Sequence, residues 1–149
     1  MGSLFMKKLE NYKNSLDILK HANFEMANED EIYRIGIIGQ FNLTFELAWK
    51  ALQAVLRIHG SHSADTGSLR EILQAGYKHG FINDAAVWLV MLKKRNQVIH
   101  IYDEDRVDEV ILLIRDSFLP AFEILAETLD EKLSETERDW ETSTRADQH

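Results

Sequence analysis

The sequence of 149 residues has no cysteine, one proline and only seven glycines. Without cysteine, disulfide bonds and cysteine-based zinc sites are excluded, and a reducing, intracellular location fits this composition. Because helix-breaking residues are scarce, the chain has few points at which a long helix must end. The longest apolar run, Ala85 to Leu92, is far too short to cross a bilayer. We therefore expect a cytoplasmic protein without a membrane segment.

Basic residues are fewer than acidic ones, and the formal net charge is −8 at pH 7. From Glu127 onward, eight acidic and three basic residues contribute −5, so the rest of the chain carries only −3. An acidic balance argues against a protein that coats nucleic acid over a broad surface. The basic run Lys93-Lys94-Arg95 lies in the nearly neutral part, however, where it can contact a phosphate group. Charge alone therefore leaves the partner open.

Apolar residues recur at three- and four-residue steps, and neither strand alternation of useful length nor an internal repeat is found. This pattern predicts an all-α fold, an up-and-down bundle of four main helices plus a short helix. Helices are expected over residues 4–26, 31–59, 68–80 and 83–100, and from residue 103 onward. Residues 1–133 are expected to form one bundle domain, and the polar residues 134–149 a disordered tail.

Turn and capping residues mark the expected helix ends. Gly60 can adopt the left-handed conformation that ends a helix. Ser68-Leu69-Arg70-Glu71 reads as a capping box, and Asn83 is expected to cap the fourth helix. Asp103-Glu104-Asp105 places negative charge at the start of the fifth, where the helix dipole favours it. Pro120 has no backbone N–H and is expected to kink or break that helix just before it.

The sharpest chemical feature is Arg95, followed by His100 and then Tyr102. Histidine transfers protons near neutral pH, and arginine pairs bidentately with phosphate. A His–Arg pair can cleave RNA without a metal ion: His helps to activate the 2′-hydroxyl, and Arg stabilises the charged phosphorane. Asn96 lies four residues before His100, so on a helix its side chain can orient the imidazole.

Spacing limits this interpretation. Arg95 and His100 are about 140° apart around an ideal helix. They converge only if the helix ends near His100 or if a second copy of the chain completes the site. On spacing alone, a solvated arginine and an ordinary helix-end histidine remain the simpler explanation. We expect a homodimer that places Arg95 and His100 of both chains around one cleft.

The segment from Phe41 to Lys50 is dense in aromatic residues at helical spacing, which predicts core packing. Glu46 is a candidate exception, because a carboxylate beside such a stripe often pairs with a buried arginine or lysine. We regard Glu46, Lys50 and Lys94 as candidates for lining a substrate cleft.

Other motifs give weaker evidence for a functional site. His59-x-x-His62, with Asp65 nearby, lacks a convincing third ligand for a metal ion. Gly67-Ser68 and Asp103-x-Asp105 resemble parts of a nucleotidyltransferase site, but no sheet is predicted to hold paired aspartates, so we interpret both as helix caps. We expect no metal and no cofactor. Gly36-x-x-Gly39 weakens its helix locally and allows close approach of another helix, from this chain or a second copy.

Several blocks, taken in order, resemble the nucleotidyltransferase substrate-binding protein family. Residues 41–50 resemble its F-E-x-x-F-E-L-A-W-K block, with Asn42 and Thr44 where the family has Glu and a variable residue. That departure puts no catalytic residue in doubt. The resemblance spans roughly residues 8–128. Its other blocks are Gly60, Arg70-Glu71, Gly80-Phe81-Ile82-Asn83-Asp84, Trp88-x-x-Met91 and Arg95-Asn96-x3-His100-x-Tyr102-Asp103-Glu104.

The family that the chain resembles belongs to the wider HEPN superfamily (higher eukaryotes and prokaryotes nucleotide-binding). The resemblance implies a dimeric bundle encoded beside a minimal nucleotidyltransferase. In related toxin–antitoxin pairs, the HEPN subunit is an RNase toxin with an Arg-x4-6-His motif. The transferase silences it by adding AMP to the tyrosine of His-x-Tyr. The resemblance gives these roles to Arg95, His100 and Tyr102, and the polar position between them to Asn96.

A non-catalytic alternative stays open. In it, the bundle presents a nucleotide or other substrate to the transferase, or serves as a dimeric scaffold. The acidic charge and the lack of a broad basic face favour this module, whereas the intact Arg95–His100 pair favours the RNase.

Overall fold

The computed structural model describes residues 2–60, 65, 67–97 and 104–147. At helix ends, including residues 96–97, 104–105 and 136–147, it describes the backbone alone. The described part is helical and has no strand, so the all-α prediction is confirmed. Its elements are α1 (Gly2–Lys20), α2 (Met26–Glu29), α3 (Glu31–Ile58), α5 (Leu69–Lys78), α6 (Ala85–Gln97), α7 (Glu104–Leu113), the π-helical segment η2 (Ile114–Phe118) and α8 (Leu119–Asp147).

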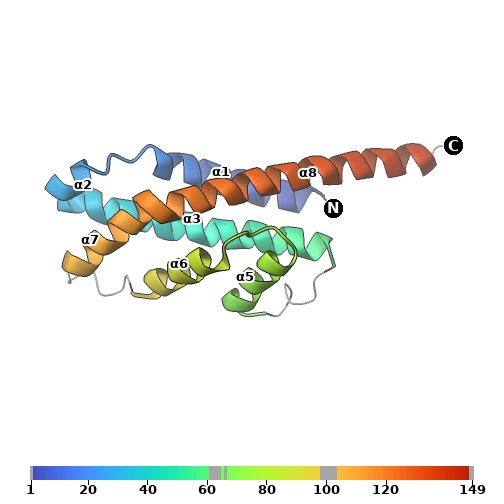
Figure 1. The fold of residues 1–149 in the computed structure, drawn as a ribbon. Coiled ribbons are helices and arrows are strands. Elements are labelled where there is room, and N and C mark those ends of the chain that lie inside the picture. Colours follow the sequence, from blue (N-terminus) through green and yellow to red (C-terminus); the bar gives the residue numbers. More distant parts are fainter. Residues whose placement is uncertain (1, 61–64, 66, 98–103, 148–149) are drawn as a thin grey trace.

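The long helix α3 forms the centre of the bundle. In Figure 1, α1 and α8 run side by side along one side of α3, and α5 and α6 lie on its other side. None of the described helices is both long enough and apolar enough to span a membrane.

The aromatic stripe of α3 is core, as predicted. Phe41 and Phe45 are fully buried. Phe41 stacks on Phe118 of η2 with ring centroids 5.1 Å apart, and Phe45 lies 6.2 Å from the ring of Trp88 in α6. Burying one such side chain contributes roughly 1.5–3 kcal/mol, so these contacts stabilise the packing of η2 and α6 against α3.

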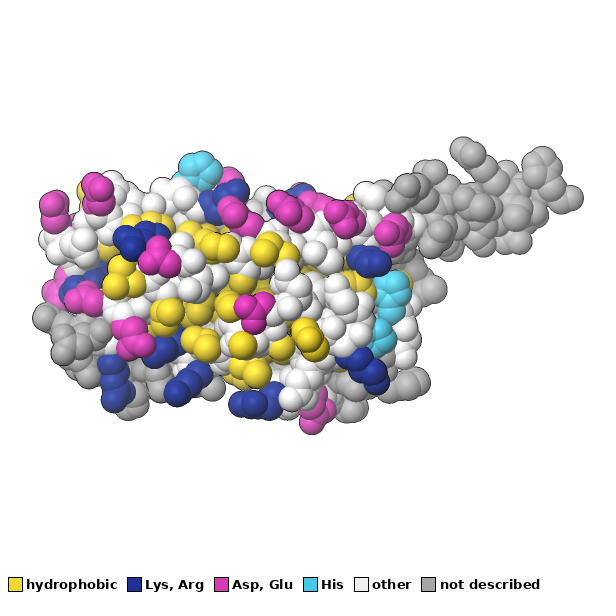
Figure 2. Space-filling view, in the orientation of Figure 1, with side chains coloured by type: hydrophobic (Ala, Val, Ile, Leu, Met, Phe, Trp, Pro, Cys, Tyr) yellow, Lys and Arg dark blue, Asp and Glu magenta, His cyan; other side chains and the backbone are white. Residues whose placement is uncertain are grey.

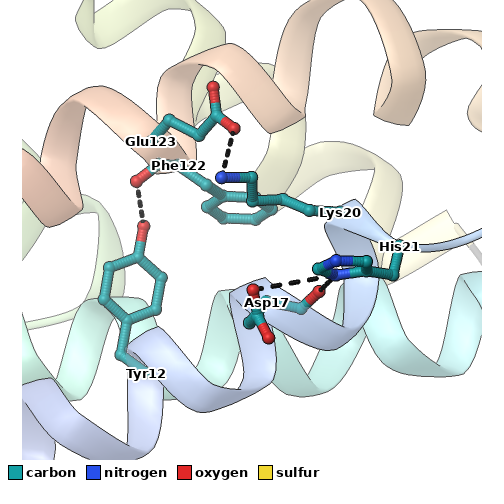
Figure 3. Close-up of polar contacts among 6 residues, drawn as sticks. All are labelled: Tyr12, Asp17, Lys20, His21, Phe122 and Glu123. Carbon is teal, nitrogen blue, oxygen red and sulfur yellow. Dashed lines mark hydrogen bonds and ion pairs between the residues drawn. The ribbon is translucent and has the colours of Figure 1, made fainter.

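Polar contacts join α1 to α8 (Figure 3). The buried Tyr12 hydroxyl donates a hydrogen bond to the carbonyl oxygen of Phe122 at 2.5 Å, and Lys20 pairs with Glu123 at 3.1 Å. Burial, reinforced by the negative charge of Glu123, raises the pKa of Tyr12 well above its ordinary value. The contact between α1 and α8 therefore combines a buried hydrogen bond of the neutral Tyr12 with an exposed ion pair.

Two helix boundaries differ from prediction. The first helix ends at Lys20 rather than near Met26, because the Asn23 side chain accepts hydrogen bonds from the backbone N–H groups of Glu25 and Met26 and forms a turn. Asp84, rather than Asn83, caps α6, since its side chain accepts from the N–H of Val87. The residue immediately before the first helical position makes this bond.

Two other predicted helix ends are confirmed. The Ser68 hydroxyl accepts from the N–H of Glu71 at the start of α5. Gly60, just beyond α3, has a φ of 75°, the left-handed conformation expected of it.

Pro120 was predicted to kink or break its helix. A break is not observed, because helical residues continue through Pro120. Instead, the hydrogen bonding widens just before it: the N–H of Leu119 donates to the carbonyl of Ile114, five residues back. A π-helical turn of this kind accommodates a ring that cannot donate a hydrogen bond. The helix α8 continues to Asp147, past the expected start of the disordered tail. The division between domain and tail at residue 133 stays a prediction.

Candidate functional site

Arg95 lies in the last described turn of α6 and reaches across to α3. Its Nη2 donates a hydrogen bond to Oε2 of Glu46 at 2.8 Å. Glu46 therefore has a basic partner, as expected of a carboxylate beside the aromatic stripe, but that partner is partly exposed rather than buried. The contact joins residues 49 positions apart in the chain and ties the end of α6 to the middle of α3.

The Glu46 carboxylate also has neighbours on its own helix. Nε1 of Trp49 donates to the same oxygen at 3.0 Å, and Nζ of Lys50 lies 3.5 Å from the other oxygen. Residues three and four positions on share a helix face, so α3 brings these donors to the carboxylate by its own geometry. The carboxylate thus collects donors from two helices.

The cluster lies at the surface. The side chains of Glu46, Arg95 and Lys50 are 29%, 34% and 40% exposed. The Arg95 guanidinium carbon also lies 5.7 Å from the centre of the buried Phe45 ring, a cation–π arrangement. A partly exposed ion pair contributes only about 0–1 kcal/mol to stability, so its main effect is to place the guanidinium.

Lys94, the neighbour of Arg95, belongs to a different contact. Its Nζ pairs with Oε1 of Glu109 at 3.0 Å and ties α6 to α7. Of the three predicted cleft residues, the structure therefore brings Glu46 and Lys50 to Arg95, while Lys94 pairs elsewhere.

His100 and Tyr102 lie outside the described residues, in the connection between α6 and α7. The backbone of Asn96 is part of α6, but its side chain is not described. The convergence of Arg95 with His100, and the role of Asn96 in orienting the imidazole, therefore stay predictions.

Sequence reasoning missed the parts played by Phe45 and Trp49 around this pair, because both were assigned to the core as apolar residues. The spacing of Trp49, three residues after Glu46, was the available signal. Asn42 also stands out, since its buried Oδ1 has no hydrogen-bond partner in the structure. A buried acceptor left unpaired costs about 1–3 kcal/mol.

The described residues include no group of three or more His, Asp or Glu side chains that could hold a metal ion. His59 instead packs against Phe81, with ring centroids 5.3 Å apart, and Asp65 pairs with Arg57 at 3.0 Å. His62 is not among the described residues.

Comparisons with known proteins agree with this fold. A family model described as "nucleotidyltransferase substrate binding protein like" matches residues 7–131. The chain is also similar to solved structures, among them the following two. A Haemophilus influenzae protein, reported to reveal the fold of a substrate binding domain of a nucleotidyltransferase, is 23% identical, with a TM-score of 0.65 over 87% of this chain and 99% of its own. A Thermus thermophilus protein is 28% identical, with a TM-score of 0.63 over 82% of this chain and 98% of its own.

No curated protein sequence gives a significant match. The family match covers most of the chain, including every residue of the Glu46–Arg95 cluster, and the solved structures share its helical fold. The chain therefore belongs to the nucleotidyltransferase substrate-binding protein family.

Proposed function

We propose that this chain is the helical partner subunit of a minimal nucleotidyltransferase and that it carries a metal-independent RNase site of the HEPN type. In this proposal Arg95 and His100 are the catalytic residues, Asn96 supports His100, and addition of AMP to Tyr102 silences the site. The observation that carries it is the placement of Arg95. Its guanidinium is held at the surface by Glu46, one turn before the connection that contains His100.

The chemistry assigned to these residues needs no metal. The 2′-hydroxyl of a ribose attacks the adjacent phosphorus and His100 takes its proton. The bond to the 5′-oxygen of the next nucleotide breaks, this oxygen takes a proton from water and leaves as a hydroxyl, and a 2′,3′-cyclic phosphate remains. Arg95 stabilises the charge that builds up on the phosphorane. Lys50, which shares the Glu46 carboxylate with Arg95, is near enough to contact a neighbouring phosphate of the same strand.

The surface charge is consistent with an anionic ligand on this side of the bundle. In Figure 2, Lys and Arg side chains lie along the lower edge, on the side of α5 and α6, whereas Asp and Glu predominate along the upper edge. Although the chain is acidic overall, Lys and Arg side chains outnumber Asp and Glu along the edge where α5 and α6 lie, and α6 is the helix that contains Arg95.

Silencing follows from simple electrostatics. In the proposed modification the Tyr102 oxygen attacks the α-phosphorus of ATP and pyrophosphate leaves. The attached AMP adds a phosphodiester charge and a bulky base close in sequence to His100. Repulsion and occlusion would then keep an RNA phosphate away from Arg95.

A homodimer is part of the proposal, and α3 supplies a surface for it. Ile32, Ile35 and Leu43 are exposed, Ile32 by 82%, and they lie on one face of α3. Between them, a Cβ added to Gly36 or Gly39 would meet no atom within 4 Å. No described part of this chain covers the two glycines, so a second α3 can approach there.

The competing candidate is a non-catalytic module that presents a nucleotide or other substrate to the transferase. It is favoured by the ion pair itself, because Glu46 already neutralises Arg95, and by the net charge of −8. A dimeric scaffold is the variant of this module in which Arg95 has only a structural role.

Growth measurements separate the candidates. Expression of the chain without its transferase should slow growth if the site cleaves RNA, and His100→Ala should restore growth. His79→Ala is the matched control, because His79 is an exposed histidine at the end of α5. Toxicity that persists in His79→Ala and disappears in His100→Ala supports the RNase. Equal growth of wild type and His100→Ala favours the substrate-presenting module.

A further inference from the structure

Glu46 is anchored within its own helix, independently of Arg95. Trp49 donates its indole N–H to Oε2 at 3.0 Å, and Lys50 lies 3.5 Å from Oε1. Both donors come from the next turn of α3, and the ring of Trp49 packs against the core. The carboxylate therefore has a defined position before Arg95, which comes from another helix, makes contact with it.

Arg95 is restrained on two sides. One nitrogen, Nη2, is bound to Glu46 at 2.8 Å, and the guanidinium lies 5.7 Å from the Phe45 ring. A guanidinium has five N–H donors in a rigid plane, so fixing one edge also fixes the direction of the others. With about a third of the side chain exposed, the remaining donors are accessible to an anion from solvent.

We propose that Glu46 is a positioning residue for Arg95: anchored by Trp49, it holds one edge of the guanidinium and turns the free edge toward an incoming RNA phosphate. This inference rests on the proposed function for the nature of the ligand. It differs from the opposite role for the same carboxylate, that of a counter-ion which competes with the phosphate for Arg95.

The two roles predict opposite effects when Glu46 is replaced. If Glu46 is a counter-ion that competes with the phosphate, its replacement strengthens RNA binding. Glu46→Ala and Glu46→Gln should then do so equally, because both side chains are neutral. If Glu46 instead positions Arg95, Glu46→Ala removes that contact and weakens RNA binding. Glu46→Gln should stay close to wild type, since its amide oxygen can still accept from Trp49 or Arg95.

The experiment measures binding of a short single-stranded RNA with 2′-O-methyl groups, which cannot be cleaved by attack of its own 2′-oxygen. We expect Glu46→Ala to bind about fivefold more weakly than wild type, the effect of losing one partly exposed charged contact. The control is Glu109→Ala. It removes the same charge beside Lys94, at the neighbouring α6–α7 contact, and should leave binding unchanged or slightly tighter.

NMR of the full-length protein supplies a readout that does not depend on RNA. The Nε–H signal of Arg95 and the indole N–H signal of Trp49 should be sharp in wild type and Glu46→Gln. In Glu46→Ala the Arg95 signal should broaden and the Trp49 signal should shift, while circular dichroism shows the helices intact.

The outcomes separate the two proposals. Tighter RNA binding in both Glu46 variants, or a sharp Arg95 signal in all variants, would overturn the positioning role. If wild type binds no RNA although the Arg95 signal is sharp and depends on Glu46, the proposed function fails and the ordering of Arg95 by Glu46 stands.

Discussion

Replacing Gly76 with alanine tests the packing of α5 against α3. A Cβ at this position would lie 2.9 Å from Cδ2 of Leu52 and 3.1 Å from Cδ1 of both Leu52 and Ile82. Because Leu52 is completely buried, it cannot move aside into solvent. Overpacking a core costs about 1–3 kcal/mol, whereas alanine in place of a helical glycine gains up to about 1 kcal/mol. We expect the free energy of unfolding to fall by about 1 kcal/mol.

Urea unfolding followed by circular dichroism measures this change in free energy. In thermal unfolding, Tm should fall by about 2–4 °C for a chain of this size. Gly36→Ala is the control, since its added Cβ meets nothing within 4 Å. At dilutions where the chain is monomeric, it should gain up to about 1 kcal/mol from helix propensity alone. If Gly76→Ala is as stable as Gly36→Ala, Leu52 has room to move and the packing argument is refuted.

Three further predictions follow from the same structure. Light scattering should show a dimer, and Gly39→Leu should give a folded monomer; a monomeric wild type at micromolar concentration would count against the α3 interface. Intact-mass spectrometry after co-expression with an active transferase should show one or more added AMP groups, and Tyr102→Phe should remove them; an unmodified Tyr102 would refute silencing by AMP. Tyr12→Phe should cost about 1 kcal/mol by leaving the Phe122 carbonyl without its donor. Since the folded pKa of Tyr12 is raised, the unfolded chain ionises first, so stability is full below about pH 10 and falls above it; pH-dependent urea unfolding should show a smaller fall in Tyr12→Phe.

Helix periodicity and capping chemistry were sufficient to predict the fold class. The apolar spacing of α3 identified Phe41 and Phe45 as core, and Ser68 with Glu71 marked the start of α5. Such features are local, because a helix presents residues three and four apart on one face whatever surrounds it. Local hydrogen bonds that compete with the regular helical pattern explain the helix boundaries that were predicted wrongly. The turn at Asn23 and the widened turn before Pro120 depend on side-chain and backbone hydrogen bonds that apolar periodicity does not detect.

The sequence by itself determined the residue types of the candidate site, namely a carboxylate beside an aromatic stripe in α3 and an arginine at the end of α6. It also made Glu46 a candidate for pairing with an arginine or lysine. Only the tertiary structure decided which one, pairing Glu46 with Arg95 while Lys94 turned to Glu109. Neighbouring residues on a helix point in directions about 100° apart, so Lys94 and Arg95 of α6 reach different helices, and the position of α6 in the bundle decides that these are α7 and α3.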